Sequence, residues 1–192
     1  MKRLALAAVT AGATFGLVWW RTSEAPAPAG RGIEHAPLPV ATIDVPLARG
    51  AIVLDGALHD EAWRDTDART GPLLSAGEPA RPHADARFVR DGASLWVGVY
   101  AADEDVRGGD LFRVTLGDRV ITVTARCDVA GDARAKCDFD GSLDDAVEDE
   151  EWAAELATPL AGLGPRAPFV VERCEVGQPC ARYSGILALG RP

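Results

Sequence analysis

The chain has 192 residues, with 29 Asp and Glu against 20 Lys and Arg, which gives a net charge of −9 and a pI near 4.8. This length suits one domain with additional segments and is enough for an autonomous hydrophobic core. Because so acidic a chain repels phosphate groups, we expect no nucleic-acid partner.

The first 20 residues predict export. Two basic residues, Lys2 and Arg3, precede an uncharged apolar run that ends in Trp19-Trp20. The run fits a cleaved signal peptide, or an uncleaved hydrophobic helix that anchors the chain in a membrane with its aromatic pair at the interface. Both interpretations place the rest of the chain outside the cytoplasm, in the periplasm or at the cell surface. A third interpretation, a buried helix of a soluble protein, does not imply export. Only the anchor would add a membrane contact.

Residues 21–45 are rich in Pro and Ala, which is typical of an extended linker. A domain is predicted over residues 46–192. It begins with a strand-like run, 51–54, that an Asp-Gly turn signal closes. Asp60 is then expected to cap one helical turn that carries Trp63 into the core.

Strand patterns continue along the chain. Two strand-like runs surround Asp91-Gly92, and the second alternates between a face with Leu95 and Val97 and a face with Trp96 and Tyr100. Residues 110–127 repeat this scheme around a turn at 117–118. Seven or eight short strands at this spacing predict an all-β protein, an antiparallel β-sandwich of jelly-roll or immunoglobulin-like type. A second helical turn is expected at 159–163.

Four cysteines agree with export. Among the three possible pairings we favour Cys127–Cys137 and Cys174–Cys180, because short loops separate the members of each pair. Neither spacing is that of a zinc or redox motif. Structural disulfides formed in an oxidising compartment are the prediction.

The sequence contains no motif of nucleophilic catalysis or phosphate binding, and its three His lie far apart. We therefore expect no enzyme. The acidic run at 137–151 has two interpretations, a solvated loop or a calcium site. The candidate calcium ligands are Asp138, Asp140, Asp144 and Asp145.

Aromatic rings bind the C–H faces of sugars, so an open aromatic face on a strand is a candidate saccharide site. Trp96 and Tyr100 share one face of the second strand-like run and are the leading candidates.

Three segments follow one another in the order found in a known family of domains. The first, "IVLDGALHDEAWRDTDA" (52–68), resembles their opening strand, Asp-Gly turn and Trp. The second, "ADARFVRDGASLWVGVYAADED" (84–105), is similar to the paired strand that ends in an Asp, here Asp103. The third, "EWAAELATPLAGLG" (151–164), resembles a later aromatic, Glu and Pro segment, and Arg173 follows where the family has a strand with an Arg. Together these segments resemble family 9 carbohydrate-binding modules.

The resemblance implies a β-sandwich of the DOMON-like superfamily, saccharide binding and, in some members, calcium. It adds Asp103 and Arg173 to the candidate ligand residues beside Trp96 and Tyr100. Haem-binding relatives use a Met ligand, and the only Met here is Met1, so no haem is predicted.

These observations predict a non-catalytic exported domain that binds a saccharide by aromatic stacking. The alternative is an envelope domain that has lost sugar binding and serves as a structural or protein-interaction sandwich. A polar groove with one or two aromatics would favour the first function, and an exposed apolar patch would favour the second.

Overall fold

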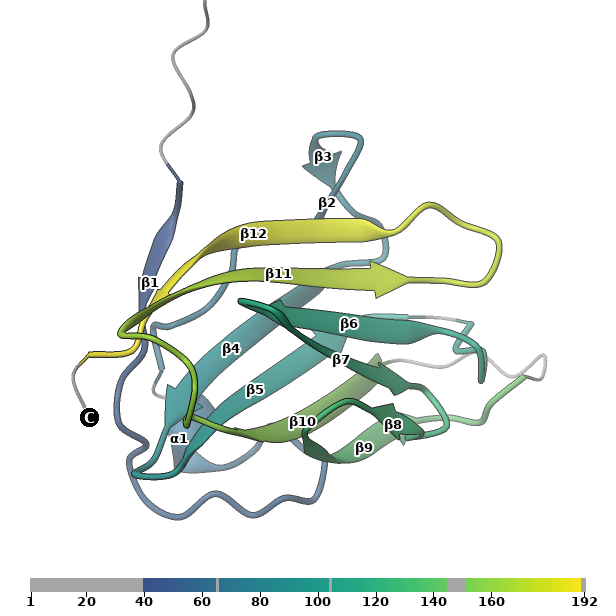
Figure 1. Ribbon diagram of the computed structural model, residues 1–192. Coiled ribbons are helices and arrows are strands. Elements are labelled where there is room, and N and C mark those ends of the chain that lie inside the picture. The colour runs from purple at the N-terminus through teal and green to yellow at the C-terminus, as the bar shows by residue number, and fades with distance from the viewer. Residues whose placement is uncertain (1–39, 65, 104, 145–150, 191–192) are drawn as a thin grey trace, which may run out of the picture. The chain divides into compact units, whose positions relative to one another are not determined.

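The computed structural model describes residues 40–64, 66–103, 105–144 and 151–190, and these form two facing β-sheets (Figure 1). The larger sheet has the strand order β3-β2-β12-β11-β6-β7-β8, and β1 pairs β12 as well. The smaller sheet has the order β4-β5-β10-β9. The larger sheet contains β1 (Thr42–Asp44), β2 (Leu74–Ser75), β3 (Glu78–Pro79), β6 (Leu111–Leu116), β7 (Arg119–Thr124), β8 (Val129–Ala130), β11 (Arg166–Cys174) and β12 (Ala181–Ala188). The smaller contains β4 (Ala84–Arg90), β5 (Ser94–Ala101), β9 (Arg134–Asp140) and β10 (Glu151–Pro159).

The predicted fold class, an antiparallel β-sandwich, is confirmed. The β4–β5 turn is fixed by the Asp91 carboxylate, which accepts the N–H groups of Ala93 and Ser94 at 2.7 Å each. The β6–β7 turn uses Gly117 at a φ of 63°, a conformation that glycine adopts without strain. Among the described strands, one pairing departs from the antiparallel scheme, because β1 runs parallel to β12.

The main core lies between the sheets, where alternate residues of each strand point inward. Phe88 of β4 meets Phe169 of β11 edge to face, with centroids 5.2 Å apart. Phe112 of β6 lies 4.9 Å from Trp152 of β10. These four rings are buried and join the two layers.

A second apolar cluster covers the outer face of the smaller sheet. We call residues 47–64 the covering segment, since its side chains Ile52, Leu58 and Trp63 pack against this face. The segment ends in the one-turn helix α1 (Glu61–Arg64), and Trp63 is fully buried, as predicted. Strand β5 is consequently buried on both faces.

Two local predictions of secondary structure were wrong. Residues 51–54 form no strand, because side chains take the backbone donors around them: Val53 N–H donates to the Asp60 carboxylate at 2.8 Å. Asp60 directly precedes α1, as predicted, and its carbonyl accepts the N–H groups of Trp63 and Arg64 at 3.0 and 3.2 Å, while its carboxylate holds the incoming chain at Val53. At 159–163 the chain makes a turn, with Leu163 N–H donating to the Leu160 carbonyl, and no helix.

Both predicted disulfides are present, Cys127–Cys137 and Cys174–Cys180. The predicted hydrophobic helix, residues 1–20, lies outside the described residues, as does most of the predicted linker. Within the described ranges no helix has the length and apolar character needed to cross a membrane.

Candidate functional site

The two aromatic candidates lie on the outer face of β5, beside the covering segment. Trp96 is only 8% exposed, and its indole N–H donates to the Asp91 carboxylate at 2.8 Å. Tyr100 is half-buried and hydrogen-bonds with Glu151; burial, followed by this carboxylate, raises the pKa of its hydroxyl. The covering segment thus occupies most of the outer face of β5, which the alternation of residues in the sequence predicts to be open.

Asp103 and Arg173 are brought together, but between the sheets. The Arg173 guanidinium pairs with the Asp103 carboxylate, and both side chains are at least 95% buried. A second nitrogen of Arg173 lies 2.9 Å from the Glu175 carboxylate. This pair joins β11 to the end of β5 and does not converge with Trp96 and Tyr100 on the outer face. A ligand role for all four remains a prediction.

The calcium candidates are spread along β9 and the loop after it. Asp138 and Asp140 are exposed on the edge strand, whereas Asp144 accepts the N–H of Gly108 and pairs with Arg126. Asp145 lies outside the described residues. Among the residues the structure describes, no three acidic, His or Cys side chains gather as a metal site would need.

A pocket of about 510 Å³ lies beside β1 and β12. This volume falls in the range of small-ligand sites, roughly 300–1,000 Å³. Its polar and aromatic lining residues are Thr42, Asp44, Arg49, Thr66, Asp67, Arg69 and Tyr183, and Leu47 and Val89 are among the apolar ones.

One wall of the pocket forms where β1, early in the described chain, pairs with β12, close to its end. Thr42 lies opposite Ile186 in the parallel pairing, and Ile186 N–H donates to the Ala41 carbonyl at 2.8 Å. Gly185 permits this approach, since a Cβ there would lie 2.6 Å from the Ala41 oxygen. β12 also supplies Tyr183, three residues before Ile186.

The opposite wall is a loop tied to the edge of β4. The Thr66 hydroxyl donates to the Phe88 carbonyl and accepts the Ala68 N–H, at 3.2 and 3.1 Å. Phe88 N–H in turn donates to the Ala68 carbonyl at 2.8 Å. Arg69, whose guanidinium donates to the Thr66 carbonyl, therefore projects from a backbone that is held on both sides.

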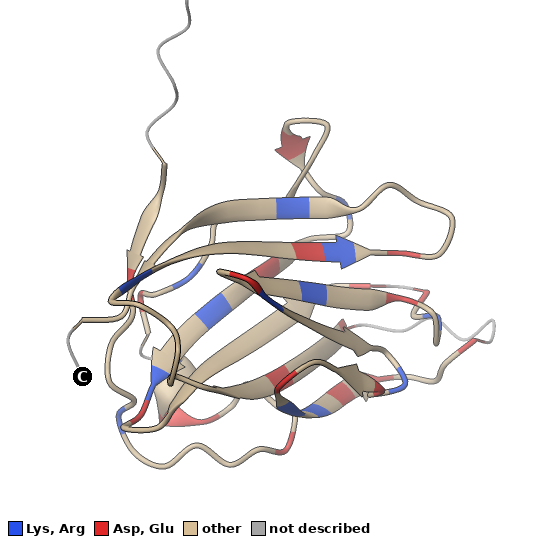
Figure 2. Ribbon diagram, viewed as in Figure 1, with Lys and Arg blue, Asp and Glu red and all other residues tan. Residues whose placement is uncertain are grey.

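The pocket offers both apolar contact and free charged groups. Tyr183 stacks on Phe169 with centroids 6.2 Å apart, and Leu47 is 59% exposed. Basic and acidic residues are interspersed over both sheets (Figure 2), and the pocket has two of each sign. Within the described ranges none of these four charged side chains, Asp44, Arg49, Asp67 and Arg69, makes an ion pair. These side chains can hydrogen-bond the hydroxyl groups of a ligand, and Arg69 can do so while one of its nitrogens donates to the Thr66 carbonyl.

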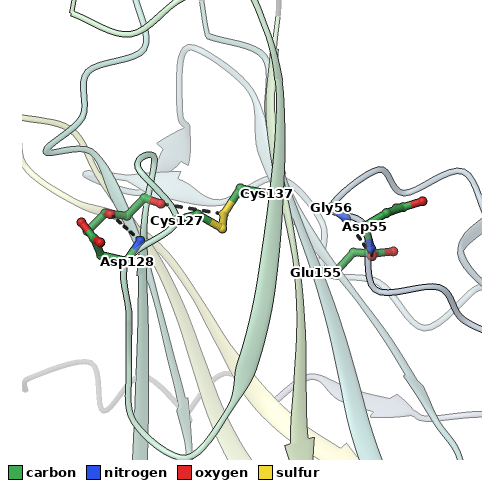
Figure 3. The surroundings of a disulfide bond; sticks show 7 residues. Asp55, Gly56, Cys127, Asp128, Cys137 and Glu155 are labelled. Carbon is green, nitrogen blue, oxygen red and sulfur yellow. Dashed lines mark hydrogen bonds between the residues drawn. A yellow bond between two sulfur atoms is a disulfide. The ribbon is translucent and has the colours of Figure 1, made fainter.

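Glu155 fixes the covering segment, whose two ends line this pocket. Its carboxylate is fully buried and accepts three hydrogen bonds: from Asp55 N–H at 2.9 Å, Gly56 N–H at 3.0 Å and the Trp63 indole at 2.6 Å (Figure 3 shows the first two). Burial raises the pKa of Glu155, and these donors partly oppose the rise. The Asp-Gly turn, the Trp and the Glu that carry the family resemblance thus form one contact.

The pocket and the role of Tyr183 in it were not predicted from the sequence. Residues 42–44, 66–69 and 183 are distant in sequence, and no local pattern links them. Tyr183 alone gave a signal, as one of only two tyrosines in the chain.

No family model matches the chain, and no curated protein matches it. Among solved structures, the chain is similar to a family 9 carbohydrate binding module from Caldicellulosiruptor kristjanssonii in complex with cellotriose. The TM-score is 0.58 and the identity 15%, over 79% of this chain and 95% of that chain. A second structure, a family 9 module from the same organism in complex with glucose, gives a TM-score of 0.58 and 13% identity, over 78% and 97%. The likeness shows a shared fold, and the predicted family 9 resemblance is confirmed at that level; the DOMON-like assignment stays a prediction.

Proposed function

We propose that this protein is a non-catalytic, exported domain that binds a saccharide in the pocket beside β1 and β12. The observation that carries the proposal is a pocket of about 510 Å³ that combines the Tyr183 ring with four charged side chains, none of which makes an ion pair with another described residue. Tyr183 and Leu47 would pack against the C–H face of a sugar ring. Asp44 and Asp67 would accept its hydroxyl groups, and Arg49 and Arg69 would donate to them.

The fold supports this proposal independently of the pocket. Two solved structures of the same fold are carbohydrate-binding modules in complex with cellotriose and with glucose. A polar pocket with an aromatic is also the feature that separates a saccharide site from a protein-interaction patch. The outer face of β5, with Trp96 and Tyr100, is the second candidate location for the saccharide, and it is the one predicted from the sequence.

Export is supported by the two disulfides, because such bonds persist in oxidising compartments. The role of residues 1–20, as a signal peptide or as a membrane anchor, belongs to the proposal and lies outside the described residues. Calcium at the acidic loop likewise belongs to the proposal.

The full chain, with both disulfides oxidised, should be screened on a glycan array with and without calcium. The proposal predicts binding to a defined saccharide class. Binding that requires calcium would assign the acidic loop to the site. A folded chain that binds no glycan would contradict the proposal and favour the envelope interaction domain.

A further inference from the structure

The Cys127–Cys137 disulfide joins the two layers of the sandwich. Cys127 follows β7 in the larger sheet, and Cys137 lies in the middle of β9 in the smaller one (Figure 3). Cys174–Cys180 differs, because it spans the turn of a single hairpin, β11–β12, within one sheet. Among the described residues the first disulfide is therefore the only covalent side-chain link between the layers.

Strand β9 depends on this link more than the other strands of its sheet do. It is an edge strand that pairs only with β10. None of its seven residues is buried, whereas β4, β5 and β10 each bury several. Because little apolar burial holds β9 against the larger sheet, the disulfide contributes much of that attachment.

The covering segment rests on the β9 backbone beside this disulfide. A Cβ at Gly56 would lie 2.4 Å from the carbonyl carbon of Cys137 and 2.7 Å from the Asp138 nitrogen. Only a glycine allows such an approach of two backbones. Gly56 also donates its N–H to Glu155 of β10, so the turn at 55–56 is held between β9 and β10.

The two ends of the covering segment line the pocket. Leu47 and Arg49 line it before the 55–56 turn, and Ala62 lines it after the turn. A shift of the segment would therefore move several pocket walls together.

We propose that the Cys127–Cys137 disulfide controls the pocket through the covering segment, as a redox-sensitive device. A dithiol reductant would break the Sγ–Sγ bond by passing two electrons and two protons to it. The products are two cysteine thiols and the oxidised, disulfide form of the reductant. β9 is then released from the larger sheet, the turn at 55–56 loses its support, and the pocket loosens. The effect on ligand binding rests on the proposed function, whereas the effect on the covering segment does not.

Hydrogen exchange of the full chain, read by mass spectrometry, tests the first step without any saccharide. The samples are the oxidised protein, the same protein in dithiothreitol, and the double variant Cys127→Ser, Cys137→Ser. Amide exchange over residues 52–58 should be about tenfold faster in the second and third samples. The matched control, Cys174→Ser with Cys180→Ser, should leave it unchanged. Equal exchange over 52–58 in the oxidised and reduced protein would overturn the proposal.

Gly56→Ala supplies a second variant that retains both disulfides. It should reproduce the faster exchange over 52–58, because its methyl group displaces the turn from β9. If the double serine variant does not fold, this variant and the dithiothreitol sample decide the matter. A saccharide found on the array should bind about tenfold more weakly after reduction and recover on reoxidation. Faster exchange with unchanged affinity would overturn the link to the pocket, and absence of any saccharide binding would instead count against the proposed function.

Discussion

The Glu155 carboxylate accepts the indole N–H of Trp63 at 2.6 Å, across 92 positions of sequence. The same carboxylate receives the backbone donors of Asp55 and Gly56. A single buried acid on β10 thus holds both the turn and the helix of the covering segment. This contact explains why an acidic residue stands in the middle of a strand whose central residues are buried.

Removal of this acceptor should destabilise the fold strongly. Glu155→Ala leaves the buried N–H groups of Gly56 and of the Trp63 indole without a partner, whereas Asp55 N–H keeps the Val53 carbonyl. We expect a loss of about 3–5 kcal/mol in the free energy of unfolding. Glu155→Gln keeps an acceptor oxygen and should lose about 2 kcal/mol. Urea unfolding followed by Trp fluorescence measures both. Glu172→Gln, which removes a partly exposed partner of Arg113, is the control and should cost less than about 1 kcal/mol. A similarly small loss for Glu155→Ala would contradict this role.

The raised pKa of Glu155 makes stability depend on pH in a defined direction. Burial is the largest cause of the rise above the ordinary value of 4.5. The folded state therefore binds this proton more tightly than the unfolded state does. The stability that results is fully present below the unfolded pKa and is lost as pH rises through the folded pKa. Urea unfolding should be measured from about pH 4 upward, because an unperturbed Glu titrates near that pH. As the pH rises, the unfolding free energy of the native protein should fall relative to that of Glu155→Gln. If the difference in unfolding free energy between the two proteins stayed constant with pH, the raised pKa of Glu155 would be contradicted.

Gly56 should tolerate no side chain. Its φ of 99° and its contact with the β9 backbone both oppose a Cβ. We expect Gly56→Ala to cost at least about 2 kcal/mol of unfolding free energy. Gly117→Ala is the matched control, because Gly117 also has a positive φ but open space around it. It should cost about 1 kcal/mol, the backbone contribution alone. Equal losses in thermal or urea unfolding would mean that the contact with β9 is unimportant.

Asp103 and Arg173 should behave as a structural pair. Arg173→Met leaves the Asp103 carboxylate buried without its partner, which should cost about 3–5 kcal/mol. Asp103→Asn combined with Arg173→Met should cost less than the sum of the two single changes, as a double-mutant cycle of urea unfolding would show. If instead both residues serve a ligand, the single variants would keep their stability and lose saccharide affinity.

The sequence predicted the parts of the fold that depend on local pattern. The β4–β5 hairpin follows from alternating residues around Asp91-Gly92, and the β6–β7 hairpin from those around Gly117. The disulfide pairing followed from short loops between the cysteines. In each case the partners lie within about a dozen residues, where turn chemistry limits the alternatives.

Long-range contacts account for what the sequence did not predict. The alternation of β5 indicates an open face with Trp96, but the covering segment buries that face through contacts such as Leu58 against Gly98. The pocket requires residue 42 to pair with residue 186, and no local pattern specifies such a pairing. The position of Asp60 before α1 was predicted, but only the fold shows that its carboxylate binds Val53 N–H.

The most direct test of the proposed function is calorimetric titration of the full chain with the saccharide class found on the array, using Tyr183→Ala and Tyr100→Ala beside the native protein. Loss of the Tyr183 ring should weaken binding by about tenfold or more, whereas Tyr100→Ala should leave the affinity within about twofold. The opposite result, with binding retained in Tyr183→Ala and lost in Tyr100→Ala, would contradict the pocket as the saccharide site and place the ligand on the outer face of β5.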